Sequence, residues 1–271
     1  MNSNLNAPDF CFITPIPLLE QFASQSSKHL CLAHLVDSSN QYASFYRRMR
    51  ERGDYVIIDN SAFELGQSYE PQKLIQLGHK CKANAIVLPD YPGQESIVTI
   101  EAAKRWIPLF KDNGFDTFFV PQSKVGDLSD WLRAYDFATT NPDIDIIGMS
   151  ILGIPNALPK ISRTYARVVM TQLLQNQQRF ANKKHHYLGL NSGVNLEVPS
   201  LLNMNALWSV DSSGPVWSGA NGIRYDITTD SYMPIAKPFL REVDFDYDIH
   251  GKEHIVECIQ HNINLTKALF K

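Results

Sequence analysis

Short runs of apolar residues, mostly β-branched or aromatic, alternate along the chain with longer segments in which apolar residues recur at helical spacing. The first kind of run predicts strands and the second predicts amphipathic helices. Strands are expected near Phe10–Ile13, Leu30–His34, Tyr55–Asp59, Ala85–Pro89, Thr117–Pro121, Asp145–Ser150, His186–Leu190 and Leu207–Asp211. Helices are expected at Leu18–Ser26, Gln41–Arg52, Pro71–Cys81, Glu95–Asp112, Leu128–Thr139, Lys160–Phe180, Glu197–Asn203 and His250–Phe270.

Alternation of strands and helices is typical of a parallel sheet, and eight strands are the number that a closed barrel needs. We therefore predict an α/β fold, a (β/α)8 TIM-type barrel, as a single domain over residues 1–271. The segment Ser212–Asp230, rich in Gly, Ser and Asn, is expected as a long loop after the eighth strand, with a C-terminal helix at about 250–270. Long loops after barrel strands commonly line active sites.

Charge and cysteine usage narrow the classes of function. The net charge of −3 gives no global basic field, so any contact with a polyanion must be local. The N-terminus lacks a basic and then apolar leader, and no 18-residue apolar run occurs, so we expect a cytoplasmic protein without a membrane partner. The isolated Cys11, Cys31, Cys81 and Cys258 are expected to be buried, and neither a metal nor a cofactor is predicted. Oligomeric state is left open.

Polar residues follow several of the predicted strands. Asp59, Asp90 and Asp211 stand after the third, fourth and eighth strands, and Gln122 follows the fifth. Each Asp alone is compatible with a helix N-cap or a simple loop role. Together they favour a functional site at one rim of the barrel, because helix N-caps do not require three carboxylates and an amide after these particular strands. Carboxylates around one barrel mouth suit chemistry at a glycosidic carbon, either transfer or hydrolysis.

The order of motifs from about Tyr55 to Gly222 resembles the queuine/archaeosine tRNA-guanine transglycosylase family, barrel enzymes that exchange guanine for a 7-deazaguanine. The family has an Asp-Ser-Gly-Gly-aromatic-Gln motif after its third strand, a base-recognising Asp and Gln, a Gly-Gly turn after the sixth strand, and an Asp followed by Pro and an Asn-Gly run after the eighth. The corresponding residues here are Asp59 and Phe63, Asp90 and Gln122, Gly148-Met149, and Asp211 with Pro215, Ser218-Gly219 and Asn221-Gly222.

This resemblance implies a pentosyltransferase in which Asp211 attacks C1′ and Asp59 transfers protons. It further implies that Asp90 accepts the N1–H and N2–H of guanine. Gln122 and a backbone N–H near Gly148 or Met149 would donate to O6, and Phe63 would stack on the base. Taken alone, Phe63 fits a core residue better than a stacking surface, and Gly148 is compatible with close packing alone.

Two departures from the tRNA enzymes concern the polymer. The chain lacks their closely spaced zinc ligands, and Trp217 and Ala220 stand where arginines would hold the anticodon. Because it is short and lacks zinc ligands, the chain resembles the phage and genomic-island DNA transglycosylases. This resemblance implies that the partners are DNA, with tRNA less favoured, and the guanine and 7-deazaguanine bases. It also implies the host cytoplasm as the location if the protein is phage-encoded. Trp217 is then a wedge or stacking surface, or a packed loop aromatic, and Asn221 a second contact to nucleic acid.

Three alternatives stay open at this point. A tRNA-guanine transglycosylase and a retaining nucleoside or glycoside hydrolase would use the same carboxylates. A barrel that only binds purine or nucleic acid would not need them, so their presence counts against it. The basic runs Arg47–Arg50 and Lys183–His186 are compatible with phosphate contacts or with solvated surface.

Overall fold

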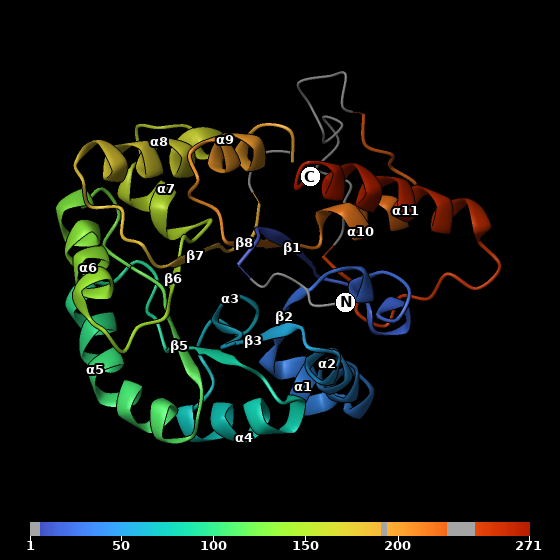
Figure 1. Ribbon diagram of the computed structural model, residues 1–271, viewed down its shortest axis with the longest axis horizontal. Coiled ribbons are helices and arrows are strands. Elements are labelled where there is room, and N and C mark those ends of the chain that lie inside the picture. Colours follow the sequence, from blue (N-terminus) through green and yellow to red (C-terminus); the bar gives the residue numbers. More distant parts are fainter. Residues whose placement is uncertain (1–5, 191–193, 227–241) are drawn as a thin grey trace.

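The computed structural model describes residues 6–190, 194–226 and 242–271, and a sheet of parallel strands lies at its centre (Figure 1). All eight predicted strands are present, and the expected (β/α)8 TIM-type barrel is confirmed. The strands are β1 Asp9–Phe12, β2 Lys28–Leu32, β3 Tyr55–Asp59, β4 Ala85–Val87, β5 Asp116–Phe119, β6 Ile146–Gly148, β7 Lys184–Tyr187 and β8 Ser209–Ser212. Hydrogen-bonded pairing runs in the order β1-β8-β7-β6-β5-β4-β3-β2, so the barrel is nearly closed.

Side chains bridge the place where β1 and β2 meet. Ser26 Oγ donates to the carbonyl of Phe10 at 2.5 Å, and the backbone N–H of Ser27 donates to Asp9 Oδ2 at 2.7 Å. These bonds connect the start of β2 to β1 and replace the ladder found between the other neighbouring strands. The two ends of the sheet are therefore held together without a continuous ladder.

Helices surround the strands, with α4, α5, α6 and α8 on the outside and the short α3 seen within the ring (Figure 1). The α-helices are α1 Ala33–Ser38, α2 Asn40–Arg52, α3 Ala62–Leu65, α4 Pro71–Cys81, α5 Ser96–Asp112, α6 Leu128–Thr140, α7 Gly153–Ala157, α8 Arg163–Asn176, α9 Glu197–Asn203, α10 Gly214–Ala220 and α11 Glu253–Ala268. The predicted helices at α2, α4, α5, α6, α8, α9 and α11 are confirmed. The structure adds α1, α3, α7 and α10.

Two layers of apolar side chains are buried on the two faces of the sheet. The smaller layer fills the inside of the barrel and includes Leu30, Ile57, Val87, Phe118 and Ile146. The larger one lies between the strands and the helices. Burial on both faces is the reason why these strands appear in the sequence as continuous apolar runs and not as alternating ones.

The N-terminal part of the chain departs from the prediction. The expected helix Leu18–Ser26 is wrong, since only two short 3-10 turns form, η1 Ile16–Leu18 and η2 Ala23–Gln25. The side chains of Ser24 and Gln25 donate to the carbonyls four residues earlier and so compete with helical backbone bonds. Strand β2 also begins and ends two residues before the predicted Leu30–His34, because α1 starts at Ala33.

The expectation of an uninterrupted loop over 212–230 is also wrong. Residues Gly214–Ala220 form α10, which packs on α11, while 227–230 lie outside the described residues. Asn262 of α11 is buried, donates to the carbonyls of Pro215 and Ile223, and accepts from the N–H of Tyr225 at 2.7 Å. A helix rich in Gly and Ser is stable here because a distant helix covers it and satisfies the backbone that follows it.

Candidate active site

The parallel strands bring four of the predicted site residues to the same end of the barrel. Asp59 is the last residue of β3 and Asp211 lies near the end of β8. Asp90 and Gln122 lie in the segments that follow β4 and β5, each three residues after the end of its strand. This is the end at which barrel enzymes carry their chemistry.

A buried carboxylate held between two amides connects three strand ends. Asp90 Oδ1 accepts from Asn60 Nδ2 at 2.8 Å, and Asp90 Oδ2 accepts from Gln122 Nε2 at 2.7 Å. Gln122 is buried, and its Oε1 has no hydrogen-bond partner in the part of the chain that the structure describes. A buried acceptor of this kind favours a donor from a ligand or a water. One Nε2 hydrogen of Gln122 also remains for a ligand, since Asp90 uses the other.

The turn after β3 has an unusual backbone conformation. Ser61 adopts a φ of 56°, in the left-handed region that side chains with a Cβ disfavour. Its N–H donates to Asp59 Oδ2 at 2.8 Å, and its Oγ lies 3.0 Å from His34 Nδ1. These contacts fix the Asp59 carboxylate at the start of α3. Strained residues of this kind concentrate at functional sites, which supports a role for the turn.

Three carboxyl groups at the mouth, those of Asp59, Asp90 and Glu64, have a raised proton affinity. Burial raises the pKa of Asp59 to about 8, and the negative charges of Glu64, Asp90 and Asp211 act in the same direction. Burial also raises the pKa of Asp90, although the hydrogen bonds from its two amide partners lower it. Burial raises the pKa of Glu64 as well, and the negative charge of Asp211 raises it further. A carboxyl with a pKa of about 8 exists in both forms near neutral pH. Asp59 is therefore suited to donating and accepting a proton.

Asp211 is held through one of its two carboxylate oxygens. Its Oδ1 lies 3.0 Å from His186 Nε2 and accepts the backbone N–H of Gly189 at 2.9 Å. Gly189 has a φ of 68°, a conformation that favours glycine and that aims its N–H at Asp211. Among the described residues no hydrogen-bond donor reaches Oδ2, so Asp211 is held through Oδ1 alone.

A buried arginine fixes the strand ends around Asp211. Arg167 of α8 forms a bidentate ion pair with Glu197 of α9, with contacts of 2.5 and 2.7 Å. Its remaining hydrogens go to the carbonyls of Met149, Leu188 and Gly189 at 2.7–3.0 Å. All five N–H donors of the guanidinium are thereby used. The peptide group between Leu188 and Gly189, whose N–H bonds to Asp211, is thus also held through its carbonyl by Arg167.

The residues expected to contact the base differ in how they are placed. Phe63 of α3, in the segment that follows Asp59, is 72% exposed, so its ring is accessible for stacking. A Cβ on Gly148 would lie 2.5 Å from Phe118, so close packing inside the barrel explains this glycine. The N–H of Met149 donates to the carbonyl of His186 at 2.8 Å, which removes it as a donor to O6. The predicted donor at Met149 is therefore corrected, because β7 takes it.

The two residues expected to contact nucleic acid are both engaged in α10. Trp217 is only 8% exposed and packs edge-on against Tyr247 with ring centroids 5.5 Å apart. Its proposed role as a wedge or stacking surface is corrected in favour of a packed aromatic, because the ring belongs to the buried core. Asn221 ends α10, and its Nδ2 donates to the carbonyl of Trp217 at 2.7 Å. Asn221 is exposed, but its amide donor already has a partner within the chain.

Sequence reasoning missed three residues of the site. His186 was treated as part of the basic run Lys183–His186, and Arg167 and Glu197 as ordinary helix residues. The strand pattern carries a signal for His186. Alternate residues of a strand face the same side of the sheet, so a histidine in the predicted seventh strand can point into the barrel beside Asp211 of the eighth. No local signal pairs Arg167 with Glu197, since they lie on different helices.

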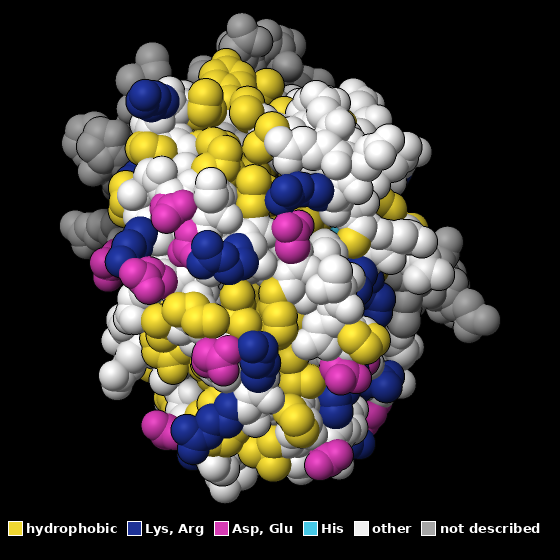
Figure 2. Space-filling model, turned by 90° about the vertical axis from the view of Figure 1, so that its left-hand side faces the viewer, with side chains coloured by type: hydrophobic (Ala, Val, Ile, Leu, Met, Phe, Trp, Pro, Cys, Tyr) yellow, Lys and Arg dark blue, Asp and Glu magenta, His cyan; other side chains and the backbone are white. Residues whose placement is uncertain are grey.

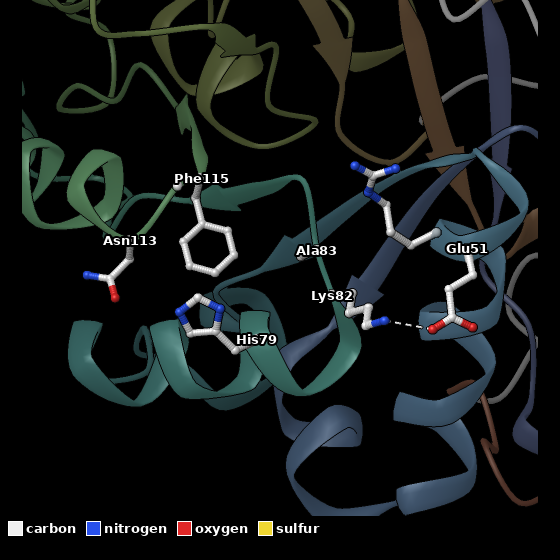
Figure 3. A pocket seen from close by; sticks show the side chains of 8 residues that line it. Glu51, His79, Lys82, Ala83, Asn113 and Phe115 are labelled. Carbon is white, nitrogen blue, oxygen red and sulfur yellow. Dashed lines mark hydrogen bonds and ion pairs between the residues drawn. The ribbon is translucent and has the colours of Figure 1, made fainter.

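A surface hollow, drawn in Figure 3, is lined by residues at the end of the barrel opposite to the carboxylates. It measures about 380 Å³ and is lined by residues that precede β3, β4 and β5, including Glu51, His79, Lys82 and Phe115. Lys82 Nζ lies 2.7 Å from Glu51 Oε1, and Figure 3 shows this ion pair as a dashed line. Because its walls come from the N-terminal ends of strands, it is separate from the carboxylate site.

The basic runs do not form a cationic patch at the mouth. Lys183 donates to one carbonyl near the end of α6 and to two of the α6–β6 connection, and Lys184 lies 3.8 Å from Asp116, both at the N-terminal end of the strands. Arg47 donates to the carbonyl of Lys80. On the face drawn in Figure 2, cationic and anionic side chains of the described residues are interspersed. Arg47–Arg50 therefore fits the solvated-surface interpretation, whereas Lys183–His186 does not, because its two histidines are buried.

No protein-family model matches the chain, and no curated protein sequence matches it. Among the described residues there is no helix long and apolar enough to cross a membrane, and no group of three or more His, Cys, Asp or Glu able to hold a metal ion. The fold defines a (β/α)8 barrel of the α/β class. Since this fold serves many activities, function is argued from the site.

Proposed function

We propose that this protein is a pentosyltransferase of the guanine transglycosylase type, which replaces guanine in DNA with a 7-deazaguanine through an Asp211–sugar intermediate. The observation that carries the proposal is the contrast between two neighbouring carboxyls. Asp59 has a pKa raised to about 8, whereas Asp211 accepts two N–H groups on one oxygen. Paired carboxyls with different environments are the means by which retaining glycosyl enzymes separate proton transfer from nucleophilic attack.

The proposed reaction proceeds by two displacements at C1′. Asp211 Oδ2 donates an electron pair to C1′ as the C1′–N9 bond breaks, and guanine leaves with that pair and takes a proton from Asp59. The incoming base then returns its N9 proton to Asp59, and N9 attacks C1′ while the ester bond to Asp211 breaks. Configuration at C1′ is retained.

Base recognition is assigned to the group around Asp90. Its carboxylate can accept the adjacent N1–H and N2–H of guanine, and the free Nε2 hydrogen of Gln122 can reach O6. Adenine presents the wrong donor and acceptor pattern and would leave buried groups unpaired, which discriminates strongly between the bases. The exposed ring of Phe63 would cover one face of the base.

The preference for DNA over tRNA rests on the resemblance noted in the sequence. Trp217 and Ala220 stand where the tRNA enzymes carry anticodon-binding arginines. A base within a duplex cannot reach a barrel mouth, so the target nucleotide is expected to be flipped out or single-stranded. With carboxylates around the mouth and a net charge of −3, binding should be modest and sensitive to salt.

The test is incubation of the full chain with radiolabelled guanine and, separately, single-stranded DNA, duplex DNA or tRNA, with Asp211→Asn as the inactive control. Label in DNA above that in tRNA supports the proposal. Faster labelling of tRNA would make the protein a tRNA-guanine transglycosylase. Abasic sites without label would indicate a retaining hydrolase, and binding without either product would indicate a purine- or nucleic-acid-binding barrel.

A further inference from the structure

His186 lies at the centre of a buried polar chain that ends on the nucleophile. It is completely buried on β7, with Nε2 3.0 Å from Asp211 Oδ1 and Nδ1 2.6 Å from Ser209 Oγ. Ser209 is also completely buried, and it shares the inward face of β8 with Asp211. The edge of the Phe118 ring packs against the imidazole, with centroids 5.4 Å apart. The ring therefore has one fixed orientation.

We propose that His186 is a positioning residue for Asp211, holding its Oδ1 so that Oδ2 is the attacking and leaving oxygen at C1′; this inference rests on the proposed function. An ionised carboxylate only accepts hydrogen bonds, so the hydrogen between His186 and Asp211 belongs to Nε2. The hydroxyl of Ser209 donates to Nδ1 when the ring is neutral and accepts from it when the ring is charged. In either case Nε2 remains the donor to Asp211.

This contact acts on both halves of the reaction. Together with the Gly189 N–H it prevents the carboxylate from rotating, so that a lone pair of Oδ2 points to C1′ during attack. In the ester, the same two donors lie on the carbonyl oxygen, and they stabilise the charge that returns to the carboxylate when the C1′–Oδ2 bond breaks. Loss of His186 should therefore slow formation and breakdown of the intermediate without changing how the base binds at Asp90.

The experiment is single-turnover exchange of radiolabelled guanine into DNA by the full chain, comparing His186→Leu with His186→Gln. The leucine variant has no donor and should reduce the rate by roughly 10- to 100-fold, with an unchanged KM for guanine. The glutamine variant places an amide N–H near the position of Nε2 and should recover most of the rate. Rescue by a residue that restores only the donor would not be produced by a purely structural role.

His185→Leu is the matched control. His185 adjoins His186 on the same strand and is equally buried, but its Nε2 lies 2.9 Å from Tyr135 Oη in the layer between sheet and helices. This variant should reduce thermal stability while leaving exchange per folded molecule unchanged. If His186→Leu fails to fold, Ser209→Ala is the second variant, because it frees the ring from its Nδ1 partner and should lower the rate with little change in volume.

The outcomes separate this inference from the proposed function. If the wild type exchanges guanine and His186→Leu does so at the same rate, the inference about His186 is overturned, while the proposed function is still supported. Absence of exchange by the wild type into any polymer refutes the proposed function, and the inference with it. Nitrogen NMR of histidine-labelled protein gives a readout independent of activity: the His186 Nε2 signal should move in Asp211→Asn, and an unmoved signal overturns the inference.

Discussion

Replacing Asp59 with asparagine should stabilise the folded protein, by an amount that grows with pH. The pKa of Asp59 is raised from 3.8 to about 8 in the folded state. Above about pH 4 the unfolded chain releases this proton while the folded protein keeps it, so wild-type stability falls as the pH rises through about 8 and is constant beyond. Asparagine has no proton to lose, so the variant avoids this decrease.

The magnitude follows from the shift. A shift of this size corresponds to at most about 5–6 kcal/mol. Water at the open mouth screens the neighbouring charges and allows the carboxylate some hydration, so we expect a gain of about 2–3 kcal/mol above about pH 8. Exchange activity should be lost in the same variant, a combination of greater stability and lost function that is common at active sites.

The assay is urea unfolding followed by circular dichroism between about pH 5 and pH 9, with wild type and variant compared at each pH. Asp112→Asn, at the exposed end of α5, is the control for loss of one carboxylate far from the mouth. A stability difference between Asp59→Asn and wild type that stays constant over this range would refute the reasoning. It would mean that the Asp59 carboxyl ionises in the folded protein as it does in the unfolded chain.

Three further predictions concern the assigned roles. Asp211→Asn should abolish exchange and any denaturant-resistant adduct with the polynucleotide, as measured on denaturing gels, whereas Asp59→Ala should still form some adduct. An adduct formed by the Asp211 variant would mean that another residue is the nucleophile. Asp90→Ala should raise the KM for guanine by about tenfold or more with less effect on kcat, and a lowered kcat at unchanged KM would make Asp90 a proton-transfer residue. Glu197→Gln should lower the free energy of unfolding by about 3–5 kcal/mol, because the buried guanidinium beside it keeps its charge. Urea midpoints should show no comparable loss for Glu51→Gln in an exposed ion pair, and equal losses would contradict this explanation.

The sequence by itself determined the barrel and the position of its main carboxyl groups along the strands. Apolar runs long enough to be buried on both faces predict parallel strands, and parallel strands necessarily bring Asp59, Asp90 and Asp211 to one end. These inferences depend only on local periodicity and chain direction. For that reason they hold without knowledge of any particular contact.

Only the tertiary structure decided what these residues contact. Whether Trp217 is exposed depends on packing against the distant Tyr247, and whether His186 faces Asp211 depends on the register between β7 and β8. Arg167 is a surface-type residue by sequence, yet Glu197 and three strand-end carbonyls make it part of the core. Each of these environments is formed by groups distant in the chain, so a local pattern indicates at most which way a side chain faces and not which group it contacts.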